Sequence, residues 1–366
     1  MPHRRRLLRL CDTLSTLRPF TLALSYCANF PSKIVQYPRC TAERFLHAAM
    51  EAHIRHSGIG TSKWSDGDIS AFVFKPRLNS IEVLPYPIAK NGEPAMPQRK
   101  IEVCRSGAGT LAPLHVGADM ALEDAGLTIT VDAGTSAGAI VAACKSLGKT
   151  GAEMEQIVLD ANFRQLIPLK IWTYPLRGYA ASTANAVSWL REITEDQTLA
   201  DCQNQLITVC GDQETQRVAT FSNRYAGESD LPVWKAVLPS FSIPEVFPAF
   251  EGHYCDGGTM MNLPVQYLPG AHPRIALRVT ERSQTGPIKG WLDRQERVLD
   301  MMLLANEQGS VTLAKKENIP VIDLPGGHTG FLDRTMTRGQ KQKLIEIGYV
   351  AATKFLESSA GKRWLA

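Results

Sequence analysis

From about residue 100 onward, short apolar runs alternate with longer stretches in which apolar residues recur every three or four positions. The short runs predict strands at Lys100–Cys104, Leu127–Ala133, Arg274–Thr280 and Val321–Leu324, with two more between Leu206 and Asn223 around the polar turn Gly211–Thr215. The longer stretches predict helices at Leu114–Asp124, Ser136–Leu147, Trp291–Leu304 and Arg338–Leu356, the last with Leu344, Gly348, Ala351 and Phe355 on its packed face. Alternation of this kind is typical of an α/β domain with a largely parallel sheet.

The first 98 residues have a different pattern, with weak periodicity, one predicted helix at Thr41–His56 and a proline-rich stretch before Gln98. We therefore expect residues 1–98 to form an N-terminal extension and residues 99–358 to form the main domain. Arg4, Arg5, Arg6 and Arg9 precede a short apolar run at Phe20–Ala28. The extension is consistent with a targeting segment, a regulatory segment or a disordered basic tail.

Composition narrows the class of protein. With 44% hydrophobic and 21% charged residues, the 366-residue chain is typical of a globular protein, and its net charge of +4 gives no reason to expect a nucleic-acid partner. The eight cysteines form no CxxC pair, so we expect free thiols and no metal centre. No apolar run reaches the length of a spanning helix, which favours a cytoplasmic or peripheral membrane location.

The pentapeptide Gly134-Thr135-Ser136-Ala137-Gly138 fits the pattern G-x-S-x-G between a predicted strand and a predicted helix. In this context a serine is presented outward on a sharp turn, and the start of the helix favours negative charge beside it. We therefore predict that Ser136 is a nucleophile, supported by Gly134 and Gly138.

A serine hydroxyl needs a base to accept its proton. The histidines His115, His253 and His328 have no recognisable catalytic context, whereas Asp256 precedes Gly257 and Gly258, which allow close backbone approach. The sequence favours Asp256 as the base, although Asp-Gly-Gly alone is also typical of a hairpin turn.

Taken in order, several segments resemble the patatin-like phospholipase family of the bacterial type, over roughly residues 100 to 270. They are Ser106–Gly109, His115–Gly126, Gly134–Gly138, Thr198–Asp201, Ser240–Pro244, Val246–Pro248, Asp256–Gly258 and Asn262–Pro264. The resemblance implies a three-layer α/β/α sandwich and a lipid acyl hydrolase with a Ser136–Asp256 dyad, an acyl-enzyme intermediate and no cofactor. It also implies a lipid or phospholipid substrate at a membrane surface, leaves room for a protein activator, and makes a secreted effector the alternative location.

In that family a glycine-rich loop supplies the oxyanion hole, and the matching positions here are Gly107, Ala108 and Gly109. Ala108 replaces the middle glycine, and Leu111-Ala112 replace the family's basic residue and last glycine. The backbone N–H of Ala108 can still contribute to the oxyanion hole, provided that φ of Ala108 is negative. Loss of the basic residue weakens the expectation of a phosphate contact and leaves ester hydrolysis intact.

Two alternatives to hydrolysis remain at the level of sequence. Gly107–Ala112 also fits the dinucleotide fingerprint G-x-G-x-x-A, with Asp132 in about the right place for a ribose contact. The altered loop is alternatively consistent with a non-catalytic member that binds lipid or protein. The apolar runs Trp172–Leu176 and Met301–Leu304 are expected in the core, with a membrane-facing rim as the alternative.

Overall fold

The computed structural model describes residues 71–77, 80–86, 99–170, 172, 174–280, 286–327, 330 and 332–365. The predicted helix at Thr41–His56, the arginine-rich start of the chain and His328 lie outside these residues. The chain divides into two compact units, Met1–Pro94 and Ala95–Ala366. In the first, β1 (Ala71–Arg77) and β2 (Ser80–Tyr86) form an antiparallel pair.

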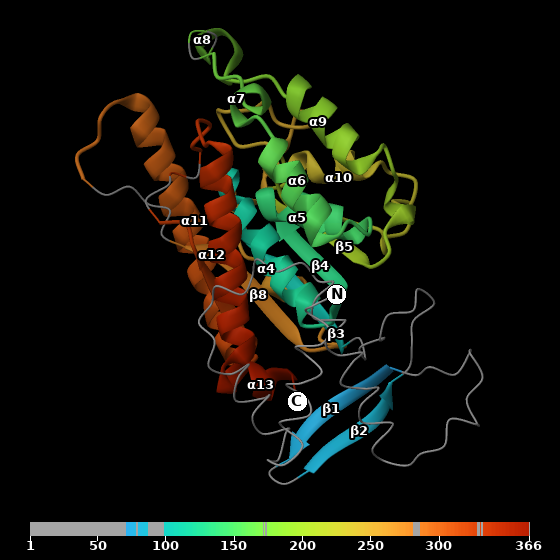
Figure 1. Cartoon of the computed structure of the whole chain (residues 1–366). Coiled ribbons are helices and arrows are strands. Elements are labelled where there is room, and N and C mark those ends of the chain that lie inside the picture. Colours follow the sequence, from blue (N-terminus) through green and yellow to red (C-terminus); the bar gives the residue numbers. More distant parts are fainter. Residues whose placement is uncertain are drawn as a thin grey trace, which may run out of the picture. The chain divides into compact units, whose positions relative to one another are not determined.

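The second unit is built on a seven-stranded sheet in the order β6-β5-β4-β3-β8-β9, with β7 also paired to β5 (Figure 1). The strands are β3 (Arg99–Arg105), β4 (Leu127–Thr135), β5 (Gln205–Asp212), β6 (Arg217–Ser222), β7 (Tyr254–Asp256), β8 (Arg274–Thr280) and β9 (Val321–Pro325). β3, β4, β5, β8 and β9 pair in parallel, and β6 and β7 run antiparallel to β5. The sheet is therefore mixed and mostly parallel, as predicted.

Helices flank this sheet. The α-helices are α4 (Pro113–Asp124), α5 (Ala137–Ser146), α6 (Gly151–Asp160), α7 (Phe163–Leu166), α8 (Tyr174–Arg177), α9 (Ala184–Thr194), α10 (Val233–Val237), α11 (Trp291–Lys316), α12 (Arg338–Glu357) and α13 (Ser359–Leu365). Short 3₁₀ turns are η3 (Gly109–Leu111), η5 (Leu199–Asp201), η6 (Pro239–Phe241), η7 (Gly257–Thr259) and η8 (Val265–Tyr267). Among the described residues, no helix combines the length and apolar character needed to span a bilayer.

Two separate hydrophobic cores show how the layers are arranged. Ile101 and Val103 of β3 pack with residues of α4, α5 and α12 on one face of the sheet. Cys104 packs with Ala314 of α11 and with Val265 on the other face. Because successive side chains of a strand point to opposite faces, these clusters place helices on both sides of the sheet. The predicted three-layer α/β/α sandwich is confirmed.

A register irregularity in β4 changes which side chains face which core. Ile101 pairs with Ile129 but Glu102 pairs with Val131, which leaves Thr130 as an extra residue in β4. Such a bulge reverses the alternation of side chains beyond it. Ile129 accordingly faces the α4 core, whereas Val131 faces the α11 core. Asp132 is thereby turned towards the α4 side.

Two helix predictions need adjustment. The helix predicted at Trp291–Leu304 continues to Lys316. The sequence pattern missed its second half because the buried positions Glu307 and Ser310 are polar and interrupt the apolar spacing. On α12, Leu344 and Gly348 are buried as predicted, while Ala351 and Phe355 are only half-buried.

Candidate active site

Ser136 lies in the sharp turn between β4 and α5, with φ 54° and ψ −125°. Positive φ is unfavourable for a residue with a side chain, and such strain is found mainly at functional positions. The turn is also tight: a Cβ on Gly134 would lie 2.5 Å from the Gly138 carbonyl oxygen, and one on Gly138 would lie 2.6 Å from that of Ser106. Both glycines of the motif are therefore required by close backbone contact.

Strand β5 brings Ser136 and Asp256 together although 120 residues separate them. Val209 pairs with Thr135 at the end of β4, and the next residue, Cys210, pairs with Asp256 at the end of β7. The two strand ends therefore meet on the same edge of β5. The Ser136 hydroxyl donates a hydrogen bond to Asp256 Oδ2 over 2.6 Å, and both residues are buried.

The environment of Asp256 favours a proton acceptor near neutral pH. Burial raises the pKa of Asp256 to about 6, while hydrogen bonds from the Ser136 hydroxyl and the Gly258 N–H oppose that rise. The Gly258 N–H donates to Oδ1 over 2.7 Å, which fixes the carboxylate and leaves Oδ2 towards the serine. A carboxylate with a raised pKa is a stronger base than an exposed aspartate.

Ser240 holds the Ser136 turn in place through two hydrogen bonds. The Ser136 N–H donates to Ser240 Oγ over 2.8 Å, and the Ser240 hydroxyl donates to the Val209 carbonyl over 2.5 Å. Ser240 is buried and connects the turn to β5. It belongs to a segment that carried the sequence resemblance, but the sequence assigned no role to its side chain.

The loop Gly107–Gly109 lies beside Ser136 and lines the same cavity. The Gly107 N–H donates to the Asn262 carbonyl over 3.0 Å, because the loop packs directly on residue 262, and it is therefore already engaged. This leaves the N–H groups of Ala108 and Gly109 as the loop's candidates for an oxyanion hole. Ala108 has φ −142°, outside the left-handed region that favours glycine, so the position does not require a glycine for its φ.

Helix α11 supports this loop through residues that gave no signal in the sequence. Asn306 accepts a hydrogen bond from the Asn262 N–H over 2.9 Å and donates to the Gly258 carbonyl over 2.6 Å. The side-chain amide of Asn262 donates to Glu307. Because these partners come from the second half of a helix predicted to end earlier, sequence periodicity could not find them.

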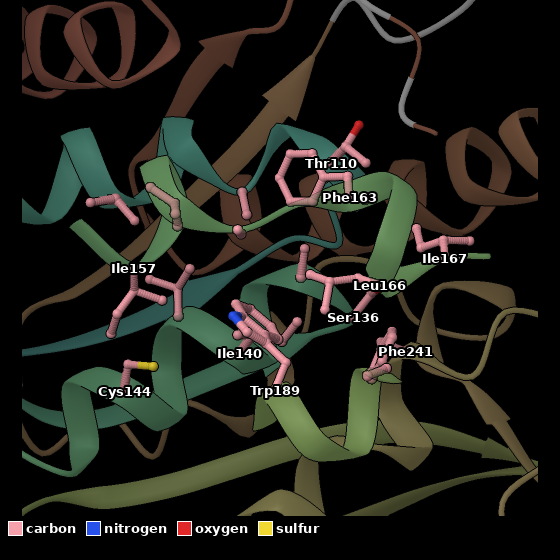
Figure 2. Close-up of a pocket in the computed structure, with 18 of the residues that line it drawn as sticks. Thr110, Ser136, Ile140, Cys144, Ile157, Phe163, Leu166, Ile167, Trp189 and Phe241 are labelled. Carbon is pink, nitrogen blue, oxygen red and sulfur yellow. The ribbon is translucent and has the colours of Figure 1, made fainter. Parts of the chain in front are cut away.

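Two cavities open at Ser136. The larger encloses about 850 Å³, its open mouth included, and lies among α5, α6, α7 and α9 (Figure 2). The smaller, about 450 Å³ with its opening included, is lined by Asp256, the glycine-rich loop, Asn262 and Met302. The dyad therefore lies where an apolar cavity and a more polar one meet.

Apolar side chains near these cavities face solvent. Met301 is 68% exposed, and Met302 and Leu304 are also exposed, although the sequence favoured core positions for this run. Trp172 and Leu176, near α8, are exposed as well. The core prediction is wrong for these five side chains, because the described residues around them leave them exposed to solvent. Adjacent exposed apolar groups are typical of an interaction surface.

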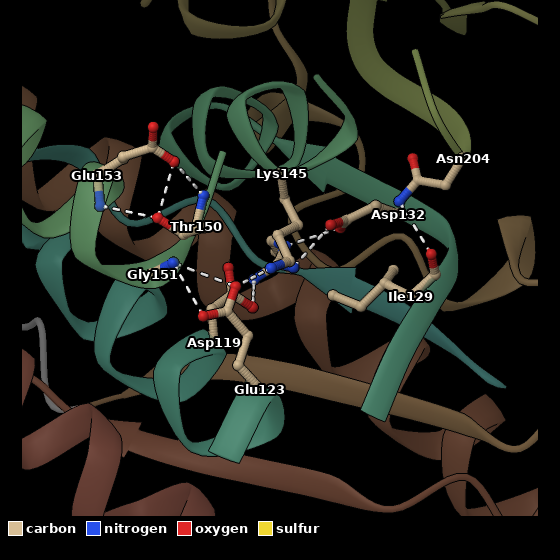
Figure 3. Close-up of polar contacts among 10 residues, drawn as sticks. Asp119, Glu123, Ile129, Asp132, Lys145, Thr150, Gly151, Glu153 and Asn204 are labelled. Atoms are coloured by element: carbon tan, nitrogen blue, oxygen red, sulfur yellow. Dashed lines mark hydrogen bonds and ion pairs between the residues drawn. The ribbon is translucent and has the colours of Figure 1, made fainter. Parts of the chain in front are cut away.

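A second buried polar cluster lies behind the glycine-rich loop. Arg105 donates to both carboxylate oxygens of Asp132 over 2.7 Å and to Asp119 over 2.6 Å, with all three residues fully buried (Figure 3). Burial raises the pKa of Asp119 to about 6 against the opposing charge of Arg105. Because Asp132 is fully buried and Arg105 bonds to both of its oxygens, that carboxylate is out of reach of a ribose. The dinucleotide alternative therefore loses its acidic residue.

The histidines considered as bases make other contacts. His115 Nε2 lies 2.9 Å from the Ser106 carbonyl oxygen, and the ring of His253 packs on that of Tyr254 with centroids 4.0 Å apart. The hydroxyl of Ser136 instead bonds to Asp256.

Known proteins show related sequences. The chain is 26% identical over 284 residues to the uncharacterized protein YqhO of Bacillus subtilis. This alignment covers 69% of this chain and 96% of YqhO. It is 27% identical over 154 residues to a patatin-like phospholipase domain-containing protein of Aspergillus niger, covering 39% of this chain and 20% of that protein. Among solved structures it aligns with VipD from Legionella pneumophila with a TM-score of 0.43 and 14% identity, covering 83% of this chain and 72% of VipD.

A family model described as patatin-like phospholipase matches residues 103–269. These residues contain the glycine-rich loop, the Ser136 turn and Asp256. Residues 103–269, which hold the candidate site, therefore match the patatin-like phospholipase family.

Proposed function

We propose that this protein hydrolyses carboxylic ester bonds of lipids, with Ser136 as nucleophile and Asp256 as its base. One observation supports this proposal above the others: a buried serine with strained backbone donates a 2.6 Å hydrogen bond to a buried carboxylate at the mouth of an apolar cavity. The family match supports a lipid ester hydrolase at the coarser level.

In the first half of the reaction, Asp256 Oδ2 takes the proton of the Ser136 hydroxyl while Oγ attacks the acyl carbonyl carbon. The N–H groups of Ala108 and Gly109 stabilise the oxyanion that forms, and the N-terminus of α5 adds favourable potential at the same point. The tetrahedral intermediate then loses the alcohol, which leaves with the proton held by Asp256. Ser136 carries the acyl group.

In the second half, Asp256 accepts a proton from a water molecule that attacks the acyl-serine carbonyl. The bond from the carbonyl carbon to Ser136 Oγ breaks, the proton returns to Oγ, and the fatty acid leaves. Every proton transfer uses the Oδ2 atom, which the Gly258 contact at Oδ1 keeps directed at the serine.

The surroundings of the dyad favour a lipid at a membrane surface as the substrate. The larger cavity is lined almost entirely by apolar side chains, and the smaller one ends at Met302 and Leu303, next to the exposed Met301 and Leu304. Exposed apolar groups beside the mouth would enter the lipid interface while the acyl chain enters the cavity. This arrangement is consistent with peripheral attachment.

The test is fatty-acid release from phospholipid vesicles and hydrolysis of p-nitrophenyl butanoate by the wild type, Ser136→Ala and Asp256→Asn. We expect activity in the wild type and its loss in both variants. Ser242→Ala is a matched control, since Ser242 is a buried neighbouring serine whose hydroxyl bonds to the Leu238 carbonyl rather than to the dyad.

Labelling of Ser136 by a fluorophosphonate separates the remaining outcomes. A wild type that labels but releases no fatty acid needs a protein activator, which is the partner left open by the sequence. A wild type that neither labels nor hydrolyses is a binding protein, and the proposed function is then wrong.

A further inference from the structure

The larger cavity follows helix α5 away from Ser136. Ala137, Ile140, Val141 and Cys144 of this helix all line it. These positions recur at the spacing of one helix face, so the cavity wall is a stripe that starts at the nucleophile and continues for two turns. An acyl chain attached to Ser136 Oγ would run along this stripe.

The cavity is closed at the end away from Ser136. Cys144 and Met154 line it there and are 3% and 2% exposed. Phe163 and Phe241 line it at the other side and are only half-buried. In Figure 2, Cys144 and Ile157 lie at one end of the pocket and Ile167 and Phe241 at the opposite end. The cavity therefore has a mouth and a floor.

The lining determines which part of a lipid can enter. Its side chains are apolar apart from Thr110 and Ser136, and Cys144 carries a neutral thiol because burial raises its pKa to about 12. A head group would lose its hydration there without finding partners. A saturated hydrocarbon chain would exchange water for close apolar contacts.

The helix also sets the depth of the cavity. Cys144 follows Ser136 by eight residues, which at about 1.5 Å per residue places the floor roughly 12 Å from the nucleophile. An extended hydrocarbon chain with bonds of about 1.5 Å advances roughly 1.3 Å per carbon, so about eight to ten carbons fill this distance. We propose that the cavity selects medium-length acyl chains, octanoyl to decanoyl, with Cys144 and Met154 as the floor that sets the limit. This inference rests on the proposed function of the same site.

The experiment measures binding without catalysis. Butanoate, hexanoate, octanoate, decanoate, dodecanoate and hexadecanoate are titrated into full-length Ser136→Ala by calorimetry, each below its micelle concentration. We expect Kd to fall by about fourfold for each added methylene as far as octanoate or decanoate, and to rise for the two longest acids. Affinity that keeps increasing through hexadecanoate, or that shows no dependence on length, would overturn the inference.

Two substitutions of the floor should move the preferred length in opposite directions. Cys144→Phe fills the floor and should shift the tightest binding to a shorter acid, while Met154→Ala deepens it and should shift the tightest binding to a longer one. A protein that is merely damaged would not produce opposite shifts. Met336→Ala is the matched control for Met154→Ala, since Met336 is also buried in this core but lines neither cavity. If neither floor variant moves the preferred length relative to this control, the floor assignment is wrong.

Hydrolysis is measured separately on p-nitrophenyl butanoate, octanoate and hexadecanoate with the unmodified protein. Length-selective binding without any hydrolysis would contradict the proposed function, while the inference that the cavity selects chain length would still hold. Hydrolysis that depends on Ser136 but proceeds equally on all three esters, together with unselective binding, would contradict the cavity and leave the dyad standing.

Discussion

Two aspartates in this domain, Asp256 and Asp119, have nearly the same electrostatic character. Each is buried, and burial raises the pKa of each to about 6. They differ in their partners and in their access. Asp256 bonds to the hydroxyl of Ser136 beside two cavities, whereas Asp119 bonds to the guanidinium of Arg105 inside the core.

The difference shows what a perturbed pKa does and does not indicate. Structural ion-pair networks shift pKa values as active sites do, so the shift alone does not mark a catalytic group. A functional assignment needs a group that can accept or donate a proton in the reaction, and a space in which a substrate can reach that group. Asp256 meets both conditions, and Asp119 meets neither.

The largest expected effect separates the two carboxylates by activity. Asp256→Asn removes the base and should lower kcat by about a thousandfold, within the range for loss of a general base. Asp119→Asn should keep kcat per folded molecule within about twofold, since it does not touch the site. Esterase assays on both variants, with folded protein quantified by circular dichroism, provide the measurement. A large loss of kcat in folded Asp119→Asn would contradict the comparison.

The next effect concerns stability. Arg105→Met leaves Asp119 and Asp132 buried without their cation, which should lower the free energy of unfolding by about 3–5 kcal/mol. The matched control is Arg278→Met: Arg278 pairs with Asp323 over 2.7 Å near the surface, and its loss should lower the free energy by less than about 1 kcal/mol. Urea denaturation measures both. Equal losses would mean that the buried pairing contributes no more than the surface pair.

A third expectation is that activity and stability respond oppositely to pH. Asp256 acts as a base only when ionised, so kcat should fall about tenfold per pH unit below its pKa of about 6. Both aspartates have folded-state pKa values above the ordinary 3.8, so the stability they contribute is fully present below about pH 4 and is lost as pH rises towards 6. Rate profiles and denaturation curves over this range test the expectation. An acid limb of kcat near pH 4 would contradict the raised pKa of the base.

The smallest expected effect concerns the exposed apolar rim. Met301→Glu should lower fatty-acid release from vesicles by about fivefold to tenfold, because it removes apolar area from the lipid contact. Turnover of a soluble short-chain ester should change by less than about twofold, since the side chain points to solvent. Val350→Glu is the control, because Val350 is 61% exposed on α12 and lines neither cavity. Equal vesicle activity in the two variants would exclude a role for this rim.

Much of the domain was predictable because its strands are apolar and its helices amphipathic. The strands β3, β4, β8 and β9 and the helices α4, α5 and α12 lie within a few residues of their predicted bounds. The proximity of Ser136 and Asp256 was expected from the resemblance to a family. The physical reason for this proximity is that Val209 of β5 pairs with β4 and the next residue, Cys210, pairs with β7. This sheet register cannot be derived from the local sequence pattern.

Other features could not be predicted, because they arise from tertiary contacts. The Gly107 N–H is engaged by the Asn262 carbonyl, a backbone contact that leaves no trace in residue types. Ser240 and Asn306 act through hydrogen bonds to segments far away in sequence. Arg105 did carry a weak signal, since a charged residue at the end of an apolar strand needs a buried partner.

The extra residue in β4 gives this strand a position that its pairing with β3 does not need. Thr130 is the position at which the strand's alternation reverses, and with Thr130 present Asp132 meets Arg105 only because of that reversal. Loss of this one codon would leave the composition of the strand almost unchanged. It would join Ile129 directly to Val131, whose partners Ile101 and Glu102 are already neighbours in β3, and ordinary alternation would keep Asp132 facing Arg105. This strand should therefore tolerate the loss of Thr130 better than a strand without an extra residue would tolerate a deletion.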